Sequence, residues 1–546
     1  MIKAPFQTLR AWLGPLLCLG MLGCLYLNAF IFPHTPIYQG GTAAIWILDA
    51  TKMLQGQVIY RDFFEFSLPG TQVLYLLLFK WLGVRAWIPS AVWVALGGGL
   101  AWTCVVISKY FLTGASVYLP SLLFLGLGFF SEPDPTHHWF STLACMVALA
   151  LLMAERSPSR LAAAGVLCGL AALFTQSRGI VALAGFATFL LWECRKKKQG
   201  WGWVVKAEMY LVLPFLATTL PVIAYLVWKV GFGLFINSTV VFLLKYWSKS
   251  FWGSIYVYGA DLPDVALWLE GPALLLWLYM HLLLPFVYLW FFVRYSRQAI
   301  AHPEKPWDRA MLLSIVGFFL FLGIAFSPVW LRLISVAPPA LILFTWFTKS
   351  PSRIARAVMR LAWAASLFAF ASQTIAVQTG WKGYLDAPTG RAALLDSGQY
   401  EKYRWVLEHT HPGDFYFQAD DCDEYFLLGL QNPAEVPFVT DSAYTRPEQV
   451  QNAIEMLEKH QVRFVMWSAW LDVPRHPGAD GSAAPLRLYL RAHYHPVREF
   501  DDQYAEVWER NQPAVTGNGM TMPASALKPQ VGPRPGRIQG GIHGKP

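Results

Sequence analysis

The chain has 546 residues, of which 55% are hydrophobic and only 14% are charged, whereas soluble domains carry about 25% charged residues. This composition excludes an ordinary soluble enzyme, a disordered chain and a disulfide scaffold, and it indicates several membrane spans. The net charge of +9 does not indicate nucleic-acid binding, because the charges are segregated. Residues 1–379 carry 27 Lys and Arg against 13 Asp and Glu, residues 380–512 carry 12 against 21, and residues 513–546 carry 4 against none.

The first long apolar run, residues 11–32, follows Lys3 and Arg10. A signal-peptide core is shorter, about 7–15 residues, so this run predicts a first transmembrane helix with a cytoplasmic N-terminus. The hydropathy pattern predicts about eleven transmembrane helices in residues 1–379. They are 11–32, 87–108, 112–130, 138–154, 160–176, 179–194, 207–229, 265–293, 310–326, 329–348 and 357–377.

Residues 70–84 decide the topology. Lys80 interrupts this apolar stretch, which also falls short of about 20 residues. With eleven spans, 18 of the 27 Lys and Arg face the cytoplasm, as the positive-inside rule requires, and a twelfth span would turn most of them outward. We therefore expect 70–84 to be an interfacial helix within a large first outer loop, residues 33–86. The stretch 42–55, ended by Gly56, predicts another helix in that loop.

After the last span the chain changes character. Residues 400–410 and 447–460 predict helices, and 414–418, 462–468, 496–500 and 503–509 predict short strands. Residues 380–512 are therefore expected to form a small α/β domain, which eleven spans place outside the cell. Its acidic run, residues 420–424, could bind a cation, although we favour a solvated turn. The Pro- and Gly-rich tail, residues 513–546, is expected to be disordered.

Three features together resemble the GT-C membrane glycosyltransferases, in the branch of the protein O-mannosyltransferases and the lipid A aminoarabinose transferase. They are the long first outer loop with its helix ending at Gly56, the segment Ile59-Tyr60-Arg61-Asp62-Phe63-Phe64 followed by Pro69-Gly70, and the acidic second outer loop, residues 131–139. The resemblance covers about residues 11–380. It implies an enzyme that takes a sugar from a polyprenyl phosphate at the outer face and transfers it with inversion.

One position departs from the resembled family. The first catalytic aspartate of the family usually opens the loop helix, about fourteen residues before the glycine. Counting back from Gly56 leads to Thr42, and residues 38–42 contain no acid. Either another carboxylate takes this role or the protein has lost transferase activity.

Sugar transfer to a hydroxyl or amine requires a carboxylate for the acceptor proton. Asp134 is the first candidate for the base, since the resembled family places a second functional acid in this loop and prolines flank it on both sides. Its alternative role is to cap a helix starting near Thr136. Asp62 is the second candidate, and its alternative is a salt bridge. Glu65 is a weaker candidate for contacting substrate, and Asp49 could simply pair with Lys52.

The leaving phosphate requires a cation. Arg178 and Arg332 lie at outer ends of predicted spans and are candidates for binding it. An interfacial anchor and a snorkelling side chain are the respective alternatives. His137 and His138 are candidates for binding substrate. No cofactor is certain, but Asp134 with one of these histidines could hold a divalent metal.

The sequence therefore predicts a membrane glycosyltransferase that moves a sugar from a polyprenyl-phosphate donor to a glycan, lipid or protein acceptor at the outer face. Membrane lipids are its other partners, and nucleic acid is not expected. The expected location is the bacterial cytoplasmic (inner) membrane, with the N-terminus inside and residues 380–512 outside. The alternative is a non-catalytic GT-C-fold protein, or a transporter or scaffold for lipid-linked glycans.

Overall fold

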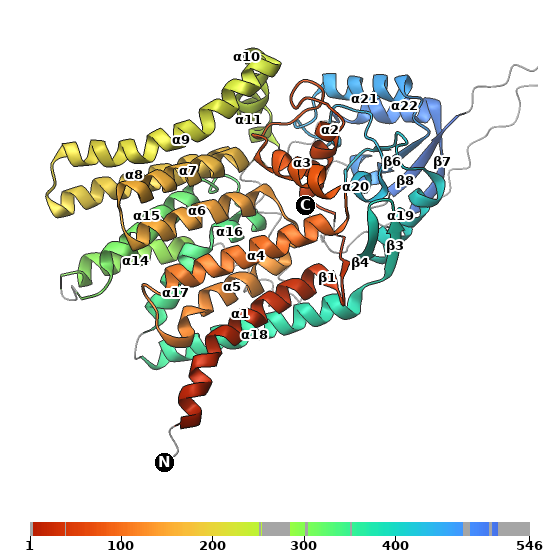
Figure 1. The fold of residues 1–546 in the computed structure, drawn as a ribbon. Helices are drawn as coiled ribbons and strands as arrows, with labels where there is room; N and C mark the ends of the chain where they lie inside the picture. The colour runs from red at the N-terminus through yellow and green to blue at the C-terminus, as the bar shows by residue number, and fades with distance from the viewer. Residues whose placement is uncertain are drawn as a thin grey trace, which may run out of the picture.

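The structure, a computed structural model, describes residues 4–38, 40–250, 253, 284–300, 304–349, 352–472, 481–501 and 505–511. A helical bundle occupies one side of the molecule and a β-sheet with its helices the other, and α2 (Ala43–Leu54) and α3 (Gly70–Leu82) lie between them (Figure 1). The predicted tail, residues 513–546, and part of the predicted span 265–293 lie outside the described residues.

The bundle contains long apolar helices and shorter ones between them. Its helices are α1 (Ala4–Ala29), α4 (Trp87–Ser108), α5 (Leu119–Leu127), α6 (His137–Ala154), α7 (Pro158–Phe174), α8 (Gln176–Lys197), α9 (Trp201–Val230), α10 (Phe232–Ile236), α11 (Phe242–Lys245), α14 (Leu284–Gln298), α15 (Trp307–Leu322), α16 (Trp330–Val336), α17 (Pro338–Thr348) and α18 (Arg353–Gly380). A single buried apolar core joins most of them.

Within the described residues, five helices are long and apolar enough to cross a membrane: α4, α6, α8, α9 and α18. The pair α16 and α17, bent by 60°, would make a sixth span, and α1, α5 and α7 contribute shorter apolar segments. The chain is therefore an integral membrane protein by the length and composition of its helices, while the count of eleven spans stays a prediction. The helix α3 has 13 residues, which is too short to span a bilayer, as expected for residues 70–84.

The helices α7 and α9 pack against each other at two glycines. A Cβ atom added to Gly165 would overlap the backbone carbonyl oxygen of Leu211, and one added to Gly169 would lie 2.7 Å from Cβ of Thr218. The four-residue spacing places both glycines on one face of α7. Because apolar surface gains little on leaving lipid for another helix, such close backbone approach is what holds transmembrane helices together.

The sheet part follows α18. The strands β3 (Gly383–Ala387) and β4 (Gly390–Leu394) form a hairpin, and β5 (Phe417–Gln418), β6 (Phe464–Ser468), β7 (Tyr494–Phe500) and β8 (Ala505–Arg510) form a sheet in the order β5-β6-β8-β7. In this sheet β5 and β6 are parallel, and the other pairs are antiparallel. The helices of this part are α19 (Ser397–His409), α20 (Glu424–Leu428), α21 (Pro447–Lys459) and α22 (Ala484–His493).

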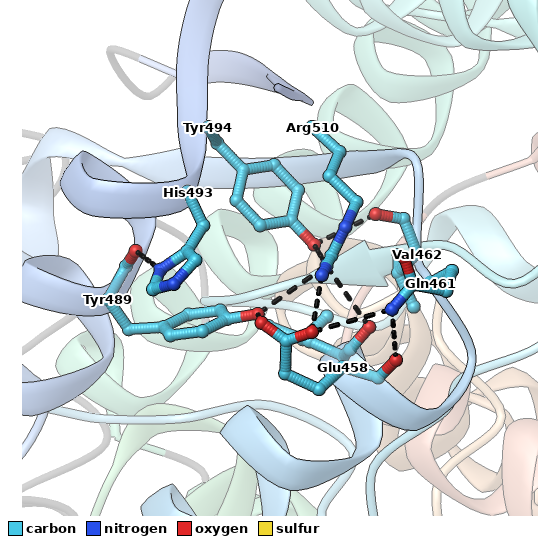
Figure 2. A network of polar contacts seen from close by, with 8 residues as sticks. Glu458, Gln461, Val462, Tyr489, His493, Tyr494 and Arg510 are labelled. Atoms are coloured by element: carbon cyan, nitrogen blue, oxygen red, sulfur yellow. Dashed lines mark hydrogen bonds and ion pairs between the residues drawn. The ribbon is translucent and has the colours of Figure 1, made fainter. Parts of the chain in front are cut away.

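A polar network ties the end of α21 to α22, β7 and β8 (Figure 2). The Arg510 guanidinium pairs with the Glu458 carboxylate and donates to the Tyr494 hydroxyl at 3.1 Å. The Tyr489 hydroxyl donates to the same carboxylate at 2.6 Å, and that of Tyr494 donates to the carbonyl of Val462 at 2.8 Å. Every group in this network has a partner within the fold, so we assign the network a structural role.

The first outer loop docks directly onto the sheet part. The ammonium of Lys52 donates to the carbonyl of Ala434 at 2.8 Å, and the N–H of Phe64 donates to the carbonyl of Glu435 at 2.8 Å. The hydroxyl of Tyr38 donates to the carbonyl of Asp423. These bonds connect residues more than 370 positions apart, so the loop and the sheet part form one folded unit.

The acidic run 420–424 is not the solvated turn that we expected. Asp423 and Glu424 are buried. Asp423 accepts a hydrogen bond from the side chain of Gln418 at 2.8 Å, and Glu424 pairs with the buried ammonium of Lys402 at 3.8 Å. A single sequence shows the charges but not the first outer loop that covers them, which explains the wrong expectation.

The substitution Gly165→Ala should destabilise the protein by about 1–3 kcal/mol, because a methyl group there has no room against the backbone of α9. Gly202→Ala is the matched control, since Gly202 also lies in a helix of this pair but has open space around it. Thermal unfolding in detergent should show a lower midpoint for Gly165→Ala than for the parent and the control. Equal midpoints for all three proteins would show that α7 and α9 do not make this contact.

Candidate active site

The N-terminus of α2 is capped by a carboxylate from another loop. Both carboxylate oxygens of Asp134 lie 3.0 Å from the N–H of Ala43 and accept its hydrogen bond, and the carboxylate also bonds to Thr42. Thr42 itself makes no side-chain cap. A negative group at this end is stabilised by the free N–H groups and by the helix dipole.

The capping role that we considered for Asp134 therefore serves a different helix. The helix α6 is capped by Thr136, whose hydroxyl accepts a hydrogen bond from the N–H of His138 at 3.2 Å. Asp134 instead reaches α2, 91 residues earlier in the sequence. This long-range contact places Asp134 beside Thr42, the position where the resembled family has its first acid.

The environment of Asp134 is suited to proton transfer near neutral pH. Burial raises the pKa of its carboxyl to about 7, against the hydrogen bonds from Ala43 and Thr42 that lower it. A cavity of about 30 Å³ adjoins the carboxylate, between Tyr38, Ala43, Ser90 and the two flanking prolines. A space of this size holds about one water-sized group. A carboxyl whose pKa is raised toward neutrality is suited to general-base catalysis.

The two adjacent histidines begin α6, and the first of them packs against α2. The ring of His137 packs on Trp46 of α2, with centroids 4.3 Å apart, and on His138 at 3.9 Å. In the part of the chain that the structure describes, Nδ1 of each ring is buried without a hydrogen-bond partner. Over those same residues no group of three His, Cys, Asp or Glu side chains is placed to hold a metal.

Arg178 is buried in the first turn of α8 and is only 3% exposed. Its Nη1 donates to the carbonyl of His138 at 2.7 Å and to the hydroxyls of Ser141 and Thr142 at 3.2 and 2.9 Å. Its Nη2 donates to the hydroxyl of Ser335 at 2.7 Å. A side chain so enclosed is not an interfacial anchor facing lipid headgroups.

The partners of Arg178 leave its charge uncompensated. All of these acceptors are neutral, and within the described residues no carboxylate forms an ion pair with this guanidinium. A buried cation with neutral partners only is unfavourable unless an anion joins it. The Ser335 hydroxyl that accepts from Arg178 donates in turn to the carbonyl of Arg332 at 2.7 Å, so a second arginine lies one helical turn away on α16.

Arg332 is anchored within the protein. Its Nη1 donates to the carbonyl of Ser327 at 3.0 Å and to the hydroxyl of the same residue. Its guanidinium lies over the ring of Trp247 at 5.7 Å from the centroid. These contacts hold the side chain against protein groups, which does not match the alternative of a side chain snorkelling to lipid headgroups.

Two further acids, one on α2 and one in the first outer loop, lie next to each other. Asp49 and Glu65 are buried and share a hydrogen bond, and the side-chain amide of Gln72 on α3 reaches them at 3.4 and 3.1 Å. Burial raises the pKa of both carboxyls, and for Asp49 the charge of Glu65 raises it further. One proton shared between the two carboxyls explains how both stay buried.

Asp62 does not join Asp134. Its carboxylate pairs with Arg61 at 2.8 Å and accepts from the N–H of Val58 at 2.7 Å. The hydrogen bond from Arg61 is the main cause that lowers its pKa. Asp62 lines a different cavity from Asp134, so the salt bridge that we considered as its alternative role is present.

Sequence reasoning missed four residues that connect these groups. Trp46, Gln72 and Ser335 contact the candidates from α2, α3 and α16, and Tyr75 of α3 donates to the carbonyl of Pro135, next to Asp134. Gln72 is one of the few polar residues of a mainly apolar helix, with Thr71 and Lys80, and that signal could have marked it. Asp49, for which we considered a simple pairing with Lys52, interacts with the charge of Lys52 and also lies against Glu65.

The raised pKa of Asp49 predicts how stability depends on pH. The folded protein holds the proton that the unfolded chain releases near pH 4, so the stabilisation from this group is complete below that pH and is lost as pH rises. Asp49→Asn cannot ionise, so its unfolding midpoint should fall less than that of the parent between pH 4.5 and 7. Asp386→Asn, which changes an exposed carboxylate, should follow the parent. An identical pH slope for Asp49→Asn and the parent would contradict the shared proton.

Comparisons with known proteins identify the fold. No family model and no curated protein sequence matches the chain. Among solved structures, ArnT from Cupriavidus metallidurans bound to undecaprenyl phosphate matches with a TM-score of 0.58 and 12% identity, over 92% of this chain and 99% of that chain. The apo state of the same protein matches with a TM-score of 0.57 and 13% identity, over 92% and 98%.

The Archaeoglobus fulgidus oligosaccharyltransferase, tethered with an acceptor peptide, is a weaker match, with a TM-score of 0.48 and 12% identity over 92% of this chain and 76% of that chain. The likeness to ArnT extends through the bundle, the first outer loop and the sheet part, since it covers nearly the full length of both chains. The expected resemblance is therefore confirmed at the level of the fold: the chain has the GT-C fold of ArnT.

Proposed function

We propose that the protein is a glycosyltransferase that moves a sugar from a polyprenyl-phosphate donor to an acceptor at the outer face of the membrane. The observation that carries this proposal is the arrangement of Asp134 and Arg178. A buried carboxylate with a pKa of about 7 lies four residues before His138, whose carbonyl accepts from a buried guanidinium without an acidic partner in the described residues. One group is suited to take a proton and the other to hold an anion.

In the proposed reaction the acceptor oxygen or nitrogen attacks C1 of the donor sugar, and the bond from C1 to the phosphate oxygen breaks. Asp134 takes the acceptor proton. Arg178, with Arg332 one turn beyond Ser335, stabilises the charge on the departing polyprenyl phosphate. The undecaprenyl phosphate bound in the structure of ArnT supports a donor of this class.

The remaining candidates take supporting roles in the proposal. His137 and His138 contribute ring faces and a carbonyl between the base and the guanidinium. Glu65 holds the first outer loop through the N–H groups of Phe66 and Ser67, at 2.7 and 2.8 Å. Asp62 is paired with Arg61, so we assign the base to Asp134 and no longer expect Asp62 to assist it.

We further propose the bacterial inner membrane as the location, with the N-terminus in the cytoplasm and residues 380–512 outside. The distribution of Lys and Arg supports this orientation. It places Asp134, Arg178 and the first outer loop on the same outer side, where a polyprenyl chain can stay in the bilayer while its phosphate reaches the guanidinium.

Thr42 favours one competing function. The residue at the start of α2 cannot act as an acid, and it lies against Asp134. A protein with this fold that binds a lipid-linked glycan without transferring its sugar would keep Arg178 and would not need a second acid. Retention of donor binding without turnover in the parent protein would favour this alternative.

Replacing Asp134 tests the proposal. Asp134→Asn removes the basicity but keeps the size and the ability to cap α2, so transfer should fall roughly 10²–10⁴-fold while expression and membrane insertion persist. Asp396→Asn is the matched control, because Asp396 caps α19 through the N–H of Gln399 at 2.8 Å. Transfer of a radiolabelled sugar from a polyprenyl-phosphate donor in proteoliposomes is the measurement. Full activity of Asp134→Asn would contradict the assignment of the base.

A further inference from the structure

A cavity of about 230 Å³ lies where the first outer loop meets the sheet part. One wall comes from the C-terminal half of α2 and the residues after it, and the other from residues 415–434 together with α21. This cavity shares no lining residue with the small space beside Asp134. Its walls are described throughout, and no role assigned above uses it.

The polar groups of this cavity suit a ligand with many hydroxyl groups. The side chains of Gln55, Gln57 and Gln431 line it, and none of these three amides has a hydrogen bond in the part of the chain described by the structure. Each amide offers both a donor and an acceptor. Vicinal hydroxyls of a sugar need both, so three open amides around one cavity match this chemistry.

The rest of the lining completes the match. Asp62 and His460 add a carboxylate and a ring nitrogen, and Phe415 and Met456 provide apolar surface for the C–H face of a sugar ring. An anion fits less well. The cationic side chain on the wall, Lys52, already donates to Ala434, and burial lowers its pKa to about 8.

The position of the cavity separates it from the reacting groups. Ala43 contacts Asp134 at the start of α2, and the residues of this stretch that line the cavity run from Leu48 to Gln55, five to twelve positions later, which corresponds to about 8–18 Å along a helix. The sugar unit that occupies the cavity is therefore a different unit from the one that reacts beside Asp134. Binding energy from such a remote part of a substrate can be used to position its reacting end.

We propose that this cavity is a saccharide-binding subsite that holds a distal sugar of the acceptor. The saccharide assignment stands on the cavity itself, and the assignment to the acceptor rests on the proposed transferase function. The first outer loop forms one wall of the cavity and the sheet part forms the other. Packing of the sheet part against this loop therefore creates the proposed subsite.

Direct binding tests this proposal without turnover. The full chain in nanodiscs is mixed with methyl glycosides of glucose, galactose, mannose and N-acetylglucosamine and with their disaccharides, and saturation-transfer NMR detects contact. We expect transfer to the ring protons of at least one sugar. The double variant Gln57→Ala and Gln431→Ala should weaken its binding roughly 5- to 150-fold, since each of the two lost hydrogen bonds contributes about 0.5–1.5 kcal/mol.

Two further variants separate a binding role from a structural one. Gln451→Ala is the matched control, because this exposed amide on α21 bonds to Glu455 outside the cavity, and it should bind like the parent. Gln431→Trp fills the cavity and should abolish binding. Thermal midpoints equal to that of the parent show that each variant is folded. Absence of transfer from the parent to every sugar, or equal binding by parent, double variant and filled variant, would overturn the proposal.

A competition experiment distinguishes a sugar of the acceptor from the sugar of the polyprenyl-phosphate donor. If the cavity holds the acceptor, a saturating polyprenyl-phosphate sugar should leave the bound saccharide in place. Displacement of the saccharide by this donor would overturn the acceptor assignment and give the cavity to the donor sugar. Saccharide binding in a protein that transfers no sugar would contradict the proposed transferase and leave the saccharide site standing.

Discussion

The hydrogen bonds from the start of α2 to the carboxylate of Asp134 join two loops that are far apart in sequence. They fix where α2 begins within the first outer loop, and the face of α2 that follows carries Trp46 against His137 and Asp49 against Glu65. Residues 43, 46 and 49 lie three apart, so successive turns of one helix present one surface to the second outer loop and to α3. Loss of the hydrogen bonds between Ala43 and Asp134 would therefore displace Trp46 and Asp49 as well.

Burial explains most of the unusual chemistry at this surface. Asp134, Asp49, Glu65 and Arg178 are all enclosed by the packing of α2, α3, α6 and α8. A buried carboxyl resists ionisation, which brings the pKa of Asp134 near neutrality. A buried guanidinium among neutral acceptors favours an anion. The same packing thus encloses both groups of the proposed mechanism, the carboxylate to which we assign proton transfer and the guanidinium to which we assign phosphate binding.

Much of this architecture could be predicted from the sequence. Apolar length and the placement of Lys and Arg indicated the membrane part, and turn residues with a short apolar run indicated α2 and α3. Long-range pairing could not be predicted. Nothing near Asp134 in the sequence shows that it caps a helix 91 residues earlier, and nothing near Asp423 shows that Tyr38 and α2 cover it. Ser335 lies in an apolar run, and only the fold brings its hydroxyl to Arg178.

We infer that this site transfers sugar although Thr42 stands where the resembled family has an acid. The most direct measurement is single-turnover transfer from a polyprenyl-phosphate sugar in proteoliposomes, for the parent and for Thr42→Asp. We predict measurable transfer by the parent, supported by Asp134, and a higher rate for Thr42→Asp because the new carboxylate lies beside that base. No transfer by either protein, with the donor bound, would contradict the account and identify a non-catalytic protein of this fold.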